Sequence, residues 1–149
     1  MTTETKRAGW KTASVLAARG IFVLVFLMAV SFKFMDINAT ATSIAGVGLP
    51  FSYRLAWLAA AFEIAVIVCF LTGAYFSEAA LLAAAYVLFL GFVFHGPSHW
   101  ASNQSEFGFF VDHFTFTAGL LFAAVHGPGR VLAMNRGWLT RQREAHLNM

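Results

Sequence analysis

Four long apolar stretches dominate the pattern of hydrophobic and polar positions along the chain. Each is about 20 residues long, which is enough to cross the hydrocarbon core of a bilayer as a helix. We predict helices because backbone groups in hydrocarbon must be hydrogen-bonded within their own segment. The predicted spans are residues 14–35, 54–72, 78–96 and 109–126. The first stretch lacks a small-residue cleavage site, so we expect it to remain in the protein and not to be a removed signal peptide.

Small and polar residues recur on one face of each of the last three predicted spans. The three sets are Ala56, Ala60 and Glu63; Gly91 and His95; and Asp112, Thr115, Gly119 and His126. Small residues let helices approach closely in lipid, so we predict that these faces point inward. The pattern therefore predicts an all-α integral membrane protein, a left-handed four-helix bundle that forms a single domain over residues 1–149.

The composition agrees with a membrane protein. Hydrophobic residues make up 59% of the 149-residue chain and charged residues only 11%, against about 25% charged residues in soluble proteins. Cys69 is the single cysteine, so the chain alone cannot form a disulfide framework, a CxxC redox pair or a cysteine metal cluster. The basic residues do not form a patch interleaved with aromatic residues, and we therefore predict no binding to nucleic acid.

Basic residues gather instead at the two ends of the chain. One group is Lys6, Arg7, Lys11 and Arg19, and the other is Arg130, Arg136, Arg141 and Arg143. Cytoplasmic segments of membrane proteins carry an excess of Lys and Arg, so both termini are predicted to be cytoplasmic. The short hairpin at residues 73–77 is then also cytoplasmic, and the two longer loops face the outside.

Glu63 lies near the middle of the second predicted span, roughly 13 Å along the helix axis from its start. An ionisable side chain at that depth is costly, and such residues usually face the bundle interior, pair with another group and mark a functional site. We therefore select Glu63 as a candidate proton-handling residue. The alternative is a neutral Glu63 that only holds a hydrogen bond to a neighbouring helix.

Lys33 lies close to the outer end of the first predicted span. Its side chain can extend to the lipid headgroups or reach inward toward a carboxylate, and its apolar neighbours do not distinguish the two directions. Arg54, at the outer start of the second span, is interpreted as an interfacial anchor.

The densest polar cluster lies at the outer ends of the last two spans, on the same membrane face as Lys33. Its members are His95, His99, Glu106, Asp112 and His113. Imidazole and carboxylate groups can bind a metal, hydrogen-bond a quinone headgroup or relay protons. Pro97 argues against a continuous helix that presents both His95 and His99, so no metal site is predicted.

Asp112 and His113 are adjacent and must point to different sides of a helix. We predict that Asp112 faces the bundle axis, because it shares a stripe with Thr115 and Gly119. His95 and His113 lie on facing helices, where such a pair could also hold a haem.

Several short motifs occur in a characteristic order along residues 15–126. They are Ser31-Phe32-Lys33-Phe34, Gly48-Leu49-Pro50, Ala60-Ala61-Phe62-Glu63, Leu71-Thr72-Gly73, Phe92-Val93-Phe94-His95, Phe109-Phe110-Val111-Asp112-His113 and Ala118-Gly119-Leu120-Leu121. In this order the chain resembles the DoxX family of small four-helix membrane proteins, which includes DoxD-type subunits of thiosulfate:quinone oxidoreductase. It departs from the family pattern in two places: Ser31 replaces a Gly, and Asp112-His113 replaces a Lys-Asn pair.

The resemblance implies a redox-linked, multi-pass protein of the bacterial inner membrane that works with a partner protein and uses a quinone. In that reading Glu63 and Asp112 handle protons, and Lys33, His95 and His113 contact the quinone. A partner must supply the electron donor, because the chain has no nucleotide-binding or other cofactor motif of its own.

Two other readings remain at this point. In the first, the chain is a non-catalytic anchor or assembly subunit of a larger membrane complex, and its buried polar residues only fix the helix register. In the second, the chain is a small proton-coupled transporter. The second is disfavoured because no Pro or Gly-Pro breaks a span at mid-depth.

Overall fold

The computed structural model describes residues 3–101, 103–134 and 137–139, and in these residues it contains helices and no strand. The helices are α1 (Thr3–Met35), α2 (Ile37–Gly46), α3 (Ser52–Thr72), α4 (Phe76–His95), the 3-10 turn η1 (Pro97–His99) and α5 (Gln104–His126). Four segments are long and apolar enough to cross a membrane: Gly9–Met35, Ser52–Thr72, Phe76–His99 and Gln104–His126. The predicted all-α fold with four spans is confirmed.

Two helices begin well before their predicted starts, the bounds of α3 and α4 differ by one or two residues, and one helix was not predicted. Helix α1 begins at Thr3 and α5 at Gln104, where the Asn103 side chain caps the helix by accepting a hydrogen bond from the Ser105 N–H at 3.0 Å. Helix α2 lies in a segment predicted to be a connection. Asp36 caps it by accepting from the Ala39 N–H at 2.9 Å, and its ten residues are too short to span a bilayer.

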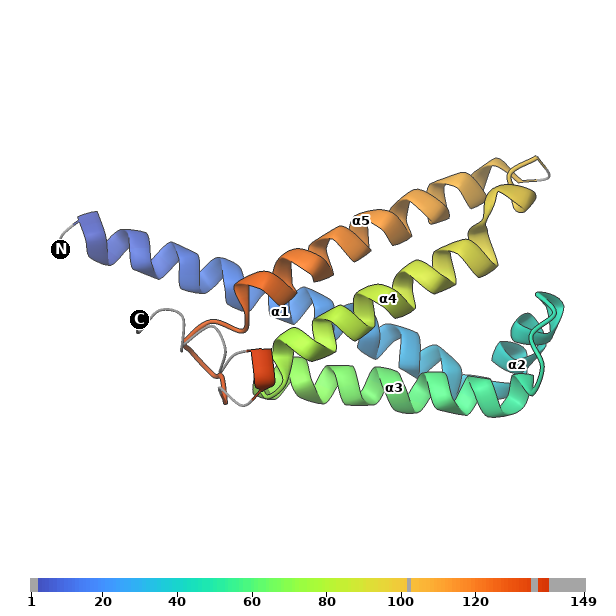
Figure 1. Ribbon diagram of the computed structural model, residues 1–149, viewed down its shortest axis with the longest axis horizontal. Coiled ribbons are helices and arrows are strands. Elements are labelled where there is room, and N and C mark those ends of the chain that lie inside the picture. Colours follow the sequence, from blue (N-terminus) through green and yellow to red (C-terminus); the bar gives the residue numbers. More distant parts are fainter. Residues whose placement is uncertain (1–2, 102, 135–136, 140–149) are drawn as a thin grey trace.

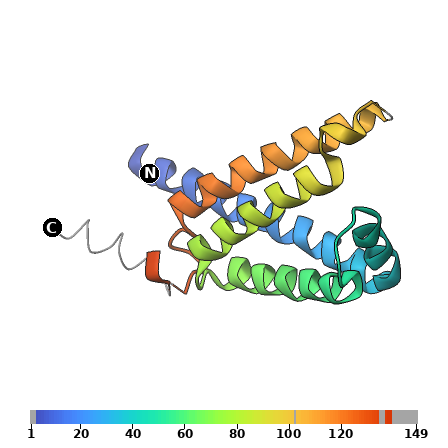
Figure 2. The same cartoon turned by 45° about the vertical axis from the view of Figure 1, so that its right-hand side comes forward.

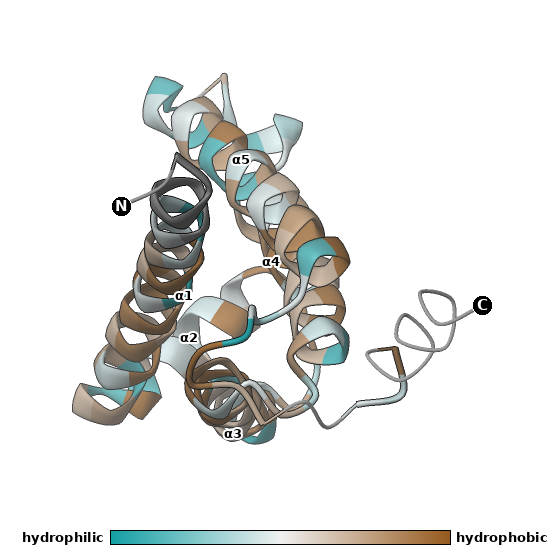
Figure 3. Cartoon of the chain, turned by 90° about the vertical axis from the view of Figure 1, so that its left-hand side faces the viewer, coloured by the Kyte–Doolittle hydropathy of each residue, from teal (hydrophilic) through white to brown (hydrophobic). Residues whose placement is uncertain are grey.

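The long helices form two arms. Helices α1 and α3 make one arm, α4 and α5 make the other, and the arms diverge from the turn between α3 and α4 (Figures 1 and 2). We call the end with that turn and the start of α1 the terminal end. The opposite end, where α2 packs on α3 and α4 connects to α5, is the loop end. Apolar residues cover most of the outward helix surfaces (Figure 3), as contact with lipid requires.

Phenylalanine rings hold the two arms together where they meet. Phe22 of α1 contacts Phe70 of α3 and Phe116 of α5, with ring centroids 5.8 and 5.3 Å away. Phe70 also packs on Phe76 at the start of α4, at 4.9 Å. Such offset and edge-on pairs stabilise a core beyond the area they bury.

Arg19 closes the terminal end. Its buried guanidinium donates to the carbonyls of Phe70 and Leu71 at the end of α3, with N···O distances of 2.8–3.1 Å. It also donates to carbonyls in the segment that follows α5, namely those of Pro128, Val131 and Leu132. From the sequence, Arg19 indicates only the topology, whereas in the structure it connects α1, the end of α3 and the segment after α5.

Candidate functional site

A cavity of about 640 Å³ lies between α3 and α4, toward the loop end. This volume is within the range of small-molecule sites. Its apolar walls are formed mainly by Leu55, Leu58, Ala59 and Phe62 of α3 and by Phe89, Leu90 and Phe94 of α4. Its polar lining comes from Lys33, Thr40, Ser43, Tyr86, His95 and His113. We call this space the α3–α4 cavity.

The wall of the α3–α4 cavity is continuous with the outer surface of the bundle. Leu58 and Phe89 line the cavity and are also 65% and 49% exposed. In a membrane, side chains exposed at this level contact hydrocarbon. A lipophilic molecule can therefore reach the cavity from the bilayer.

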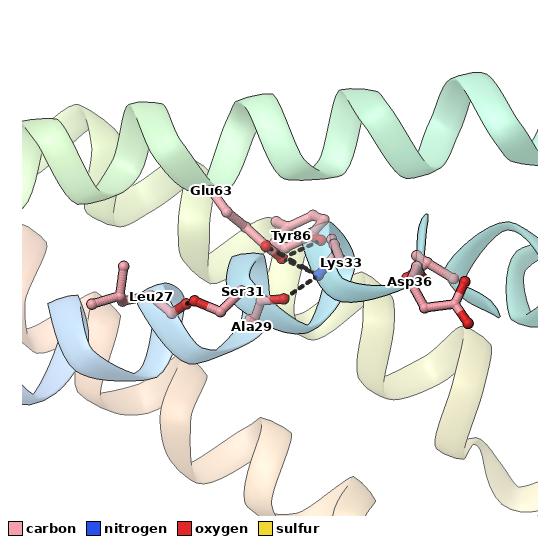
Figure 4. Close-up of polar contacts among 8 residues, drawn as sticks. Leu27, Ala29, Ser31, Lys33, Asp36, Glu63 and Tyr86 are labelled. Carbon is pink, nitrogen blue, oxygen red and sulfur yellow. Dashed lines mark hydrogen bonds and ion pairs between the residues drawn. The ribbon is translucent and has the colours of Figure 1, made fainter. Parts of the chain in front are cut away.

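Lys33, Glu63 and Tyr86 form a hydrogen-bonded triad beside the cavity (Figure 4). The Lys33 ammonium donates to both carboxylate oxygens of Glu63 at 2.8 and 3.0 Å, and to the Ala29 carbonyl at 3.4 Å. The Tyr86 hydroxyl donates to Glu63 Oε1 at 2.9 Å. Of the two directions considered for Lys33, the structure has the inward one.

Glu63 is only 1% exposed and lies on the buried face with Ala56 and Ala60, as the spacing predicts. It does not line the cavity, whereas Lys33 and Tyr86 do. Glu63 is therefore connected to the cavity through these two side chains: it pairs with the Lys33 ammonium and accepts a hydrogen bond from the Tyr86 hydroxyl. Tyr86 was not predicted as a site residue, because a tyrosine in an aromatic-rich helix carries no distinguishing pattern.

A second polar group lies at the loop end of the cavity. His95 Nδ1 is 2.6 Å from Glu106 Oε2, and the two side chains are 25% and 21% exposed. His113 Nδ1 is 2.7 Å from the Phe109 carbonyl. A carbonyl oxygen only accepts, so the neutral His113 ring carries its proton on Nδ1 and leaves Nε2 as an acceptor. The Glu106 carboxylate selects the same tautomer of His95.

The rings of His95 and His113 lie with centroids 5.0 Å apart. They contact one another and so do not flank the space that a flat macrocycle needs, which does not fit the haem pair considered from the sequence. Among the described residues, no group of three or more His, Cys, Asp and Glu side chains is placed to hold a metal ion.

The prediction that Asp112 faces the bundle axis is wrong. Asp112 is exposed, as is Thr115, and His113 is the residue of the pair that turns toward α4. The rotation of α5 follows its buried residues Thr117, Leu120 and Ala124, which continue the face of His113. Asp112 therefore lies away from the α3–α4 cavity.

The other polar residues considered from the sequence do not line the α3–α4 cavity. His99 belongs to η1 and does not line the cavity. His126 and Arg54 are exposed, and the Arg54 guanidinium lies over the Phe51 ring at 5.8 Å. Ser31 is exposed and donates to the Leu27 carbonyl of its own helix at 2.7 Å, so the departure from the family's Gly leaves the triad untouched.

Gly91 allows α4 and α5 to approach at His113. A Cβ atom at position 91 would lie 2.8 Å from His113 Cβ. We expect Gly91→Ala to destabilise the protein by about 1–3 kcal/mol, because the helices must separate at this point. Thermal unfolding in detergent measures the effect. Gly119→Ala is the matched control, since its Cβ would meet the Phe22 ring at an ordinary 3.4 Å; equal stability of the two variants would contradict the argument.

The DoxX family profile matches residues 14–96, more than half of the 149-residue chain. Comparisons with curated proteins and with solved structures found no match. The matched region contains Lys33, Glu63, Tyr86 and His95, and it ends before Glu106 and His113. This multi-pass membrane protein belongs to the DoxX family.

Proposed function

We propose that this protein is the quinone-binding membrane subunit of a redox complex in the bacterial inner membrane, with both termini in the cytoplasm. The observation that carries the proposal is the α3–α4 cavity: about 640 Å³, largely apolar and polar at separate places on its wall. The basic residues Lys11 and Arg130 near the terminal end support the orientation.

The residues present fit a quinone. A quinone has a flat ring with oxygens on opposite edges and an apolar tail, and it dissolves in the bilayer. Four polar side chains of the cavity lining form two pairs: Lys33 and Tyr86 are joined through Glu63, and His95 and His113 contact one another at the C-terminal end of α4. The apolar walls suit the ring and the tail, and the lipid-facing side chains Leu58 and Phe89 mark the route of entry. When bound, the quinone supplies redox chemistry that is coupled to proton uptake and release.

The His95–Glu106 pair is suited to exchange a proton with the bound headgroup. Glu106 holds Nδ1 of His95, so Nε2 is the nitrogen left for the exchange, and the carboxylate stabilises the imidazolium that forms. The pair is partly exposed at the loop end, so the proton taken up by His95 can pass to water there.

The triad supplies a second proton-bearing group. The Tyr86 hydroxyl lies at the cavity wall and donates a hydrogen bond to Glu63. Lys33 holds the carboxylate in place and balances its charge. A partner protein supplies or removes the electrons.

A pair of tryptophan variants tests the proposal. Ala59 lines the cavity, whereas Ala61 on the same helix is exposed on the outer surface. Ala59→Trp fills the cavity and Ala61→Trp does not. After gentle extraction from the native membrane, we expect near-stoichiometric quinone in the wild type and in Ala61→Trp, and its loss from Ala59→Trp, as measured by mass spectrometry.

The same measurement distinguishes the anchor reading. If a partner protein co-purified with the wild type and both variants while none of the three retained quinone, the chain would have a purely structural role and no quinone site. Phospholipid in place of quinone in the wild type and in Ala61→Trp would likewise contradict the proposal.

A further inference from the structure

A second, smaller cavity lies at the terminal end, far from the α3–α4 cavity. Its volume is about 200 Å³, and it lies between the start of α1 and the segment that follows α5, open to the surface on one side. Lys11 and Arg130 line it from these two sides, and Val15, Leu16 and Val131 provide apolar surface. We call it the terminal cavity.

Arg19 and Gly129 fix the position of the segment that forms one side of this cavity. The Arg19 Nη1 atom donates to the Pro128 and Val131 carbonyls at 3.0 and 3.2 Å, which fixes the segment after α5 against the bundle. Gly129 has a φ of +80°, and a Cβ atom there would lie 3.1 Å from Val15 Cγ1. The segment therefore lies directly on α1, in a conformation that an L side chain rarely adopts.

The terminal cavity carries positive charge, and none of the described residues that line it is a carboxylate. Lys11 and Arg130 line it, and the acceptors of Arg19 among the described residues are all backbone carbonyls. Glu78, at the same end of the bundle, accepts from the Leu139 N–H at 2.9 Å and does not line the cavity. The cavity is thus suited to an anion.

The depth of these residues indicates what kind of anion fits. Lys11 lies two residues inside the span Gly9–Met35, and Arg130 follows the end of α5 by four residues, so both lie at the level of the lipid headgroups. Val15 and Leu16 come one turn deeper, toward the hydrocarbon. A cationic rim above an apolar wall matches an amphiphile with a negative head.

We propose that the terminal cavity binds the phosphate of an anionic phospholipid. Lys11 and Arg130 contact the phosphate, and the first part of an acyl chain lies on Val15 and Leu16. The bound lipid joins the start of α1 to the segment after α5, next to the carbonyls that Arg19 holds. This proposal is independent of the quinone site, because the two cavities share no residue.

Lipid retention by the full-length chain tests the proposal. The protein is exchanged into detergent with phosphatidylglycerol or with phosphatidylcholine of the same acyl chains, and bound lipid is counted by native mass spectrometry. We compare the wild type with Arg130→Gln, with Lys11→Gln/Arg130→Gln, and with Arg54→Gln. The last variant removes an exposed interfacial arginine from the loop end.

We expect the wild type and Arg54→Gln to retain phosphatidylglycerol in preference to phosphatidylcholine. Each Lys or Arg near the membrane surface strengthens the attraction to an anionic lipid. The affinity for phosphatidylglycerol should therefore fall about fivefold in Arg130→Gln and about 30-fold in the double variant. Equal retention of the two lipids, or equal losses in Arg130→Gln and Arg54→Gln, would overturn the proposal. Displacement of the lipid by millimolar inorganic phosphate would also overturn it, since the site would then bind a soluble anion.

Discussion

Glu63→Gln is expected to lower the quinone-linked turnover of the complex by about 100-fold, because Gln can neither bind and release a proton nor neutralise the Lys33 ammonium. The substitution leaves the Lys33 ammonium, which is only 15% exposed, without its counter-charge. Loss of one partner of a buried ion pair destabilises a protein by about 3–5 kcal/mol. Turnover is measured with the complex extracted from the native membrane, and stability is measured by thermal unfolding of the purified chain.

A double variant separates the two effects of Glu63→Gln. Lys33→Met/Glu63→Gln removes the unpaired charge, so stability should largely return while turnover remains low. Tyr86→Phe is the milder variant, because it removes one hydrogen bond to Glu63 and keeps the ion pair. It should lower the stability by about 0.5–1.5 kcal/mol. Normal turnover in a folded Glu63→Gln variant would favour the anchor reading over a quinone site.

The spans and the buried face of α3 were predictable because they depend on local properties of the sequence. Hydrophobic length defines the spans, and the helical period places Ala56, Ala60 and Glu63 on one face. Helix α2 was not predicted, because a helix of ten residues is shorter than a membrane span and the segment was interpreted as a loop.

The site itself depends on contacts between helices, which a single sequence does not encode in its periodicity. The inward direction of Lys33 follows from the position of Glu63 on another helix. The rotation of α5 is decided by the fit of His113 against Gly91, which turns Asp112 outward although a stripe of small and polar residues favoured it. Tyr86 becomes visible as a site residue only when Glu63 is seen within hydrogen-bond distance.

Arg19 is the residue whose role the sequence could have indicated. It lies ten residues inside the span Gly9–Met35, among apolar residues, and its side chain is buried. An arginine at such a depth must find acceptors within the protein. Its partners could not be named in advance, because they are main-chain carbonyls of segments that the fold brings together.

Arg19→Ala is expected to destabilise the protein by more than about 3 kcal/mol, because it leaves several main-chain carbonyls without their donor. Arg19→Lys keeps the charge but not the planar fork that reaches Phe70 and Pro128 together, so it should recover only part of the loss. Unfolding in mixed micelles measures the stability of both variants.

A local measurement identifies the cause of that destabilisation. The Met134 N–H donates to the Thr72 carbonyl at 2.8 Å, beside the carbonyls of α3 that Arg19 holds. Its hydrogen exchange should accelerate in Arg19→Ala and Arg19→Lys, because the segment after α5 detaches from the end of α3. In the control Arg54→Ala, exchange at Met134 should remain as in the wild type, since Arg54 is exposed and contacts the Phe51 ring at the other end. If Arg19→Lys instead matched the wild type in both stability and exchange, then positive charge alone, without the guanidinium fork, would hold this end of the bundle together.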